Sequence, residues 1–156
     1  MHIELDAVDL QILDLMQANA RISNVDLAKE LAMAPSAVLE RVKKLEQKKV
    51  ILQYNTSISP PAVNQKLLAF IFIKTKEGAD SDAKIAASLA KVPEVQEVHI
   101  IAGEDCFFVK VRTEDTASLI ALMRKSLKRI PNVLSTKTTI VLETVKEQQQ
   151  VVIPKK

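Results

Sequence analysis

The chain has 156 residues, of which 47% are hydrophobic and 26% are charged, and its formal net charge is +3. This length suits one ordinary domain or two small ones, and this composition excludes disordered and collagen-like chains. Cys106 is the only cysteine, so an internal disulfide is excluded and a structural zinc site is not expected, and no apolar run approaches the roughly 20 residues of a membrane span.

Three helices are predicted within residues 1–50, the first of them from the residue that caps its start. Asp6, with Asp9 at the third helical position, is typical of an N-cap, and hydrophobic residues then recur at helical spacing to about Asn19. The residues before Asp6 lack the apolar core of a secretion signal, so we expect a cytoplasmic protein.

The second and third helices have the spacing of a helix-turn-helix. Ser23 opens a short helix that ends near Leu31, and Pro35 suits the first position of a longer helix, because its missing N–H is not needed there. A turn of about three residues separates them, as in DNA-binding helix-turn-helix units. The third helix has one apolar face, so its opposite, polar face is free to enter a major groove. The apolar residues are Val38, Val42 and Leu45.

The candidate DNA contacts come from this polar face and from the start of the second helix. In the first turns of a recognition helix Arg favours guanine, Glu accepts from cytosine, Ser suits any base, and Ala touches a thymine methyl group. Lysines that follow suit phosphates, as do polar residues near the second helix. A solvated, charged helix face is the alternative interpretation. The candidate DNA-binding residues are Arg21, Asn24, Ser36, Ala37, Glu40, Arg41, Lys43 and Lys44.

A β-strand linker or hinge is predicted for residues 51–64. Val50–Ser59 is β-prone, and the Pro60–Pro61 pair prevents a helix from continuing. The predicted domains are therefore a helix-turn-helix domain of residues 1–50, the linker of residues 51–64, a second domain of residues 65–145 and a tail of residues 146–156.

The second domain has the element order β-α-β-β-α-β of a ferredoxin-like fold, so the fold class of the chain is α+β. The strands are predicted at Leu67–Thr75, Glu94–Ala102, Cys106–Arg112 and Val133–Val145, and the helices at about Asp80–Lys91 and Thr116–Ile130. The run Leu67–Ile73 is apolar without alternation, so both faces of this strand need cover. Two helices cover one face of such a sheet, and we expect the other face to pack on a second copy.

Three segments of the first domain form a specific series in order and spacing. Asp6–Leu13 reads DAVDLQIL, Ala20–Ala28 reads ARISNVDLA, and Pro35–Glu46 reads PSAVLERVKKLE. This series resembles the Lrp/AsnC family, the feast/famine transcriptional regulators of bacteria and archaea, and the second domain resembles the RAM domain with which that family senses ligands. The resemblance covers nearly the whole chain.

This resemblance implies a sequence-specific DNA-binding regulator that is not an enzyme. Its expected architecture is a three-helix, winged-type helix-turn-helix domain followed by the βαββαβ RAM domain. It also implies dimers formed through the C-terminal sheets, assembly into an octamer or another ring of dimers, and a free amino acid as effector, with no other cofactor and no metal.

The resemblance further implies a place for the effector. The family has a Gly-Asp-x-Asp pattern between the second and third strands of its RAM domain, whereas residues 103–106 read Gly-Glu-Asp-Cys. A hairpin turn alone also explains Gly103, and ordinary sheet packing also explains the residues of the last strand. The candidate effector-binding residues are Gly103, Glu104, Asp105, Cys106, Thr136, Thr138 and Ile140.

The turn before the third helix departs from the family as well. Ala32 and Ala34 stand where the family often has glycine and serine, so the turn lacks a residue suited to positive φ and the helix lacks a capping side chain. We therefore expect the first turn of this helix to stay loose until DNA is bound.

Two other functions fit parts of the pattern. An architectural DNA-compacting protein would use the same helices with little sequence preference and without an effector. An amino-acid-binding regulatory subunit of an enzyme would use the βαββαβ half and keep the helices for protein contacts.

Overall fold

The computed structural model describes residues 4–76, 79–103 and 106–155. These residues divide into two compact units. The first unit contains Met1–Ser57 together with Glu147–Lys156, and the second contains Ile58–Lys146. Glu104 and Asp105, two of the predicted effector-binding residues, lie outside the described residues.

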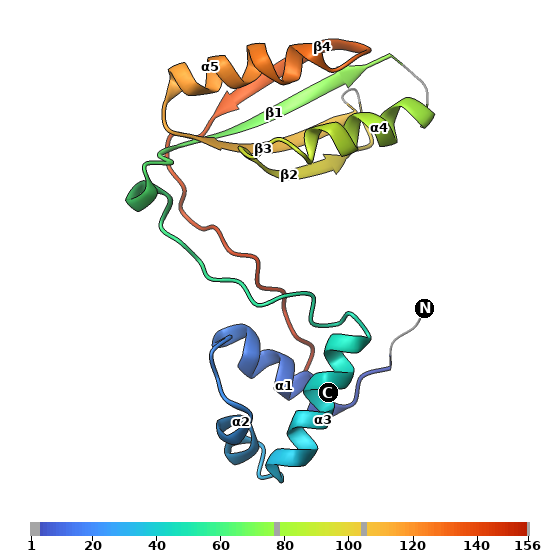
Figure 1. Ribbon diagram of the computed structural model, residues 1–156, viewed down its shortest axis with the longest axis vertical. Coiled ribbons are helices and arrows are strands. Elements are labelled where there is room, and N and C mark those ends of the chain that lie inside the picture. Colours follow the sequence, from blue (N-terminus) through green and yellow to red (C-terminus); the bar gives the residue numbers. More distant parts are fainter. Residues whose placement is uncertain (1–3, 77–78, 104–105, 156) are drawn as a thin grey trace. The chain divides into compact units, whose positions relative to one another are not determined.

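Three helices form the body of the first unit (Figure 1). They are α1 (Ala7–Ala18), α2 (Asn24–Glu30) and α3 (Pro35–Gln47). The Asp6 carboxylate accepts from the Asp9 N–H at 2.8 Å and completes a capping box, and Ser23 Oγ accepts from the Asp26 N–H at 3.1 Å. The predicted starts of these helices are therefore confirmed.

One apolar cluster holds the three helices together. The face of α3 that was predicted to be apolar is buried, and it packs against α1 and α2. Burial of such side chains contributes about 1.5–3 kcal/mol each, which explains why this face of α3 packs inward. The opposite face of α3 is left exposed to solvent. The members of the cluster are Ile12, Leu27, Ala28, Val38, Val42 and Leu45.

The turn between α2 and α3 contains an alanine in the left-handed region. Ala32 has a φ of 49°, as its place in a tight turn requires. This conformation costs about 1–2 kcal/mol for a residue with a Cβ atom, whereas glycine adopts it freely. The expected need for a positive-φ residue in this turn is thus confirmed, and alanine meets it at a cost.

We expect Ala32→Gly to stabilise the first unit by about 0.5–1 kcal/mol, because relief of the left-handed conformation outweighs the added chain entropy of glycine. Amide exchange at the buried residues Leu27 and Val38 in the full chain should slow by up to about fivefold. Ala18→Gly, at a helical position of α1, is the control and should speed the same exchange. Equal destabilisation by both substitutions would contradict the strain at Ala32.

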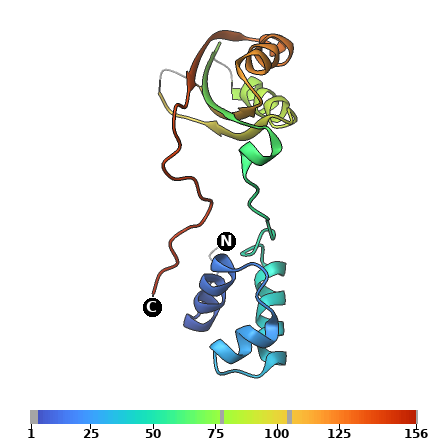
Figure 2. The ribbon, with the colours of Figure 1, turned by 90° about the vertical axis from the view of Figure 1, so that its left-hand side faces the viewer.

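The second unit is a four-stranded antiparallel sheet in the order β2-β3-β1-β4. The helices α4 and α5 lie on one side of it (Figures 1 and 2), which confirms the predicted β-α-β-β-α-β order. The elements are β1 (Leu67–Thr75), α4 (Ala79–Leu89), β2 (Val95–Ile100), β3 (Phe107–Thr113), α5 (Thr116–Lys125) and β4 (Val133–Ile140), with short 3-10 turns at Pro60–Val63 and Leu127–Arg129.

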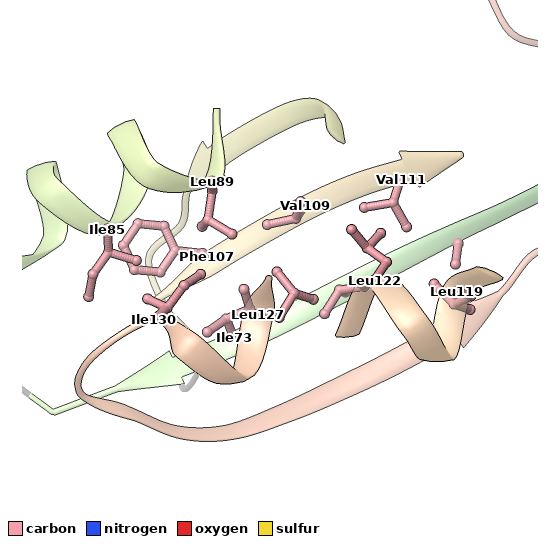
Figure 3. Close-up of a cluster of buried hydrophobic side chains, with 12 residues drawn as sticks. Ile73, Ile85, Leu89, Phe107, Val109, Val111, Leu119, Leu122, Leu127 and Ile130 are labelled. Atoms are coloured by element: carbon pink, nitrogen blue, oxygen red, sulfur yellow. The ribbon is translucent and has the colours of Figure 1, made fainter. Parts of the chain in front are cut away.

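A single core fills the space between this sheet and its helices (Figure 3). The strands contribute every second residue, such as Ile71 on β1 and Val109 on β3, which face each other across the β1–β3 pair. Leu89 of α4 and Leu122 of α5 belong to the same core. The alternate residues of β1 and β3 therefore lie on the opposite face of the sheet.

Two of the predicted strands differ from the structure. Val50–Ser59 forms no strand, and β4 ends at Ile140 instead of Val145. A strand needs a hydrogen-bonding neighbour, and β1, the neighbour of β4, begins at Leu67, two residues beyond the partner of Ile140. Val50–Ser59 has the composition of a strand, but it pairs with none of the strands that the structure describes.

Candidate nucleic-acid interface and effector site

The exposed face of α3 carries most of the residues predicted to contact DNA. Ser36, Glu40, Lys43 and Lys44 are exposed, and Ala37 is half-buried. Pro35 at the first position starts the helix, while Ala34 supplies only its backbone carbonyl, which accepts from the N–H groups of Ala37 and Val38. The expected lack of a side-chain cap is confirmed. The looseness of the first turn stays a prediction, which amide exchange at Ala37 can test.

Arg41 has a different position from the one predicted for a base-reading residue. Its Nη1 lies 2.7 Å from a carboxylate oxygen of Asp6 and 2.7 Å from one of Asp9, at the start of α1. These two hydrogen bonds raise the pKa of Arg41 further above its usual value. The guanidinium thus ties α3 to the capping box of α1, and the prediction that it reads guanine is at odds with this pairing.

The capping box at Asp6 makes the first unit sensitive to acid. The hydrogen bond from the Asp9 N–H, followed by the one from Arg41, lowers the pKa of Asp6 below its ordinary 3.8. Because the folded-state pKa is the lower one, this carboxylate stabilises the fold above pH 3.8, and the contribution is lost as the pH falls through the folded value. We expect Asp6→Asn to flatten the pH dependence of the first unit's stability below about pH 5.

Amide exchange of Leu27 and Val38 between pH 5 and 3, corrected for intrinsic rates, measures this effect in the full chain. Asp14→Asn removes an exposed carboxylate from the same helix and serves as the control. As the pH falls, the wild-type chain and the control should lose amide protection with the same slope against pH, and Asp6→Asn should lose it with a shallower slope. A parallel slope in Asp6→Asn would refute the role assigned to the capping box.

The two predicted contacts near α2 lie at its start. Arg21 is exposed in the turn before the helix, and its N–H donates to the Asn19 Oδ1 at 3.0 Å. Asn24 is half-buried and is the first residue of α2, directly after the capping Ser23. A helix N-terminus offers N–H groups and a positive dipole, so this end of α2 suits a phosphate of the DNA backbone.

Tyr54, which the sequence patterns did not single out, fixes the far end of α3. Its hydroxyl donates to Glu46 Oε1 at 2.7 Å, and burial together with this carboxylate raises the pKa of Tyr54 to about 12. Glu46 is the only acid among the basic residues that end α3. Tyr54 therefore anchors the segment after α3 to this carboxylate.

The turn between β2 and β3 lies beside the end of β1. The Cys106 N–H donates to the Ile73 carbonyl at 2.9 Å, and the Ile101 N–H donates to the Cys106 carbonyl at 3.0 Å. Gly103 has a φ of +148°, which favours glycine, although a Cβ there would meet no atom within 4 Å. Backbone conformation therefore explains this glycine, and no described atom outside its chain neighbours lies close to the position of a Cβ.

Of the predicted effector residues on β4, only Thr136 lies at this end of the sheet. It is paired with Ile73 on β1, so β1 alone separates it from the Cys106 turn, a distance of about 10 Å over two strand spacings. Thr138 points under α5 and donates to Met123 Sδ at 3.6 Å. Ile140 pairs with Ala69, about 13 Å along the sheet from Thr136. The five of these residues that the structure describes, Gly103, Cys106, Thr136, Thr138 and Ile140, thus do not form one compact cluster.

The face of the sheet opposite the helices carries an aromatic group, which we call the open face. Phe108 of β3 stacks on Phe70 with ring centroids 5.1 Å apart and meets Phe72 edge-on at 5.3 Å. His99 lies 5.8 Å from the same ring, and Glu97, whose pKa is lowered by a hydrogen bond from Lys110, borders the group. The helices α4 and α5 lie on the other side of the sheet (Figure 2). The three phenylalanines are half-buried, and a partly exposed apolar group of this kind is typical of an interaction surface.

Comparison with known proteins agrees with this architecture. The AsnC-type helix-turn-helix domain matches residues 5–46, and the Lrp/AsnC ligand binding domain matches residues 68–151. The chain belongs to the Lrp/AsnC family. The leucine-responsive regulatory protein of Haemophilus influenzae is 35% identical over 150 residues, which cover 96% of this chain and 90% of that protein.

Solved structures of Lrp/AsnC regulators share the fold. A transcriptional regulator from Neisseria meningitidis, solved with L-methionine, has a TM-score of 0.88 at 30% identity and covers 96% of this chain and 97% of its own. A feast or famine regulatory protein from M. tuberculosis, also complexed with L-methionine, has a TM-score of 0.88 at 30% identity and covers 97% and 100%.

Membership of the Lrp/AsnC family makes this chain a DNA-binding transcriptional regulator and not an enzyme. Within residues 4–76, 79–103 and 106–155 no group of His, Cys, Asp or Glu is placed to hold a metal ion. None of the helices described there is long and apolar enough to cross a bilayer.

Proposed function

We propose that this regulator binds a free amino acid at the end of the sheet formed by the β2–β3 turn and Thr136, and that binding changes its affinity for an operator. The observation that carries the proposal is the combination of two elements in one chain. The first unit presents the basic, exposed face of α3, and the second has an open turn at Gly103 beside a strand end. Two related regulators bound to L-methionine support an amino-acid ligand.

A dimer built on the open face supplies the two-fold symmetry that operator recognition needs. Phe70, Phe72 and Phe108 offer an apolar patch at the centre of this face, and burying each ring contributes about 1.5–3 kcal/mol. Two α3 helices related by a two-fold axis then read half-sites of a roughly palindromic operator in the cytoplasm. Association of such dimers into an octamer or another ring brings effector sites of neighbouring dimers together.

On α3 we assign base contacts to Ser36, Ala37 and Glu40, and phosphate contacts to Lys43 and Lys44. Arg21 and Asn24 contact the backbone from the start of α2. Arg41 takes no part in base reading in this proposal, because Asp6 and Asp9 already hold its guanidinium. Arg41 instead fixes the orientation of α3 relative to the start of α1.

A thermal-shift screen against the common amino acids tests the effector. A ligand present at about 100 times its dissociation constant adds about 2.7 kcal/mol, which raises the melting temperature of a chain of this size by about 5–10 °C. Thr136→Val should reduce that shift, because the variant loses a hydroxyl near the ligand. Thr139→Val, on the other face of the same strand, should not.

A screen in which no amino acid raises the melting temperature would remove the effector from the proposal. The architectural DNA-compacting function would then be favoured, and its mark is a small ratio of specific to non-specific DNA affinity. Absence of DNA binding at any salt concentration would instead favour a regulatory subunit of an enzyme.

A further inference from the structure

The last residues of the chain bind α1 through a reciprocal set of hydrogen bonds. The Gln17 Nε2 donates to the Val151 carbonyl at 2.7 Å, and the Val151 N–H donates to the Gln17 Oε1 at 2.9 Å. The Gln150 Nε2 donates to the Gln17 backbone carbonyl at 3.1 Å. We call these three bonds the clasp; residues 147–155 lie beside α1 in Figures 1 and 2.

The clasp satisfies backbone groups that need partners. A side-chain amide that bonds both the N–H and the carbonyl of one residue replaces a neighbouring strand for that residue, and it fixes the register at Val151. The Gln17 carbonyl belongs to the last turn of α1, where the carbonyl oxygens have no N–H donor within the helix. Since that turn contains no basic residue, Gln150 supplies the helix with a C-terminal donor from the other end of the chain.

The segment held by the clasp follows closely after β4 in the sequence. Residues 141–146 join β4 directly to the clasped segment, and extended chain of that length spans at most about 20 Å. β4 carries Thr136, the residue of this strand that the proposed effector site includes. The strand proposed to sense the effector is therefore tied to α1 by a short connector, in addition to the connector of residues 51–58.

We propose that the clasp couples β4 to the DNA-binding unit, so that the response of DNA affinity to an amino acid requires it. This inference rests on the effector function proposed above. The coupling has two states, with the three bonds of Gln17 made or broken, and an effector shifts their balance as far as it favours one of them. The ligand class is an α-amino acid, and the coupled element is α1 of the same unit that holds α3.

The first test examines the clasp itself, without any effector. In the full chain, the Val151 amide should exchange at least tenfold faster in Gln17→Met than in the wild type, because its acceptor is gone. Gln11→Met makes the same change at an exposed position of α1 and should leave the Val151 rate unaltered. Equal Val151 rates in the wild type and Gln17→Met would overturn the clasp.

The second test measures coupling as the ratio of DNA dissociation constants with and without saturating L-methionine. Gln17→Met, and a chain ending at Lys146, should bring this ratio close to one while their effector-free affinity stays within about twofold of the wild type. Gln17→Met added to the truncated chain should change nothing more, because both remove the same contact. Gln11→Met should keep the wild-type ratio.

The outcomes separate the two proposals. A wild-type ratio retained in Gln17→Met overturns the coupling and leaves the effector function intact. A wild-type chain whose DNA affinity does not change with L-methionine or any other common amino acid overturns the effector function, and the coupling with it. In that case the exchange rate of Val151 alone decides whether the clasp exists in solution.

Discussion

Replacing Lys43 and Lys44 by alanine is expected to weaken DNA binding about thirtyfold per recognition helix at about 0.15 M salt. Both side chains are exposed on α3, and a phosphate contact releases about 0.9 counterions. The slope of log affinity against log salt should therefore become shallower by about 1.8 for each helix engaged. A dimer that uses both helices would show twice that change in slope.

Fluorescence anisotropy on a random-sequence duplex measures this effect without knowledge of the operator, because the counterion term does not depend on sequence. Lys125 and Lys128, both exposed in the second unit, give a matched control when replaced together by alanine, since the loss of net charge is the same. If the control pair lowers the slope as much as the α3 pair, overall charge drives binding and α3 is not the interface.

Phe108→Asp is expected to prevent formation of the proposed dimer and to leave a monomer. The substitution removes the ring that contacts Phe70 and Phe72 and places a carboxylate at the centre of the open face. A two-fold interface loses this ring twice, at about 1.5–3 kcal/mol each before the cost of burying a charge. The dimer dissociation constant should rise by at least about 100-fold.

Analytical ultracentrifugation at micromolar concentration measures this change, and circular dichroism shows whether the variant is folded. Ala121→Asp places the same charge on the exposed surface of α5 and should leave the dimer intact. Thr139→Arg changes the open face without removing a ring. It provides a second test of the interface if Phe108→Asp does not fold. Dimers that persist in both open-face variants would show that this face is not the interface.

Features of the fold that depend on residues close in sequence could be predicted, because their causes are local. Asp6 and Ser23 cap helices through residues three positions away, and the apolar spacing of α3 defines its buried face. The strands of the second unit follow from apolar runs separated by turns. The end of β4 could not be predicted, because it depends on where β1 begins, more than 60 residues earlier.

The candidate site shows the same limit. Arg41 on an amphipathic helix near lysines has the features of a base-reading residue, and its carboxylate partners lie 32 and 35 residues away. A pair of acids at the start of the first helix is also explained by capping alone, so it gives no sign of the ion pair. Gln17 and Val151 are separated by 134 residues, and neither residue type carries a pattern that indicates the contact.

The first unit is built from two segments that the second unit separates in the sequence, and this determines the order of their biosynthesis. The segment that contains α1, α2 and α3 is synthesised before the second unit, whereas the segment from Glu147 onward is synthesised after it. The whole second unit is therefore synthesised, and free to fold, before α1 receives its final hydrogen bonds. A nascent regulator acquires a complete DNA-binding unit only after the unit proposed to sense the effector already exists.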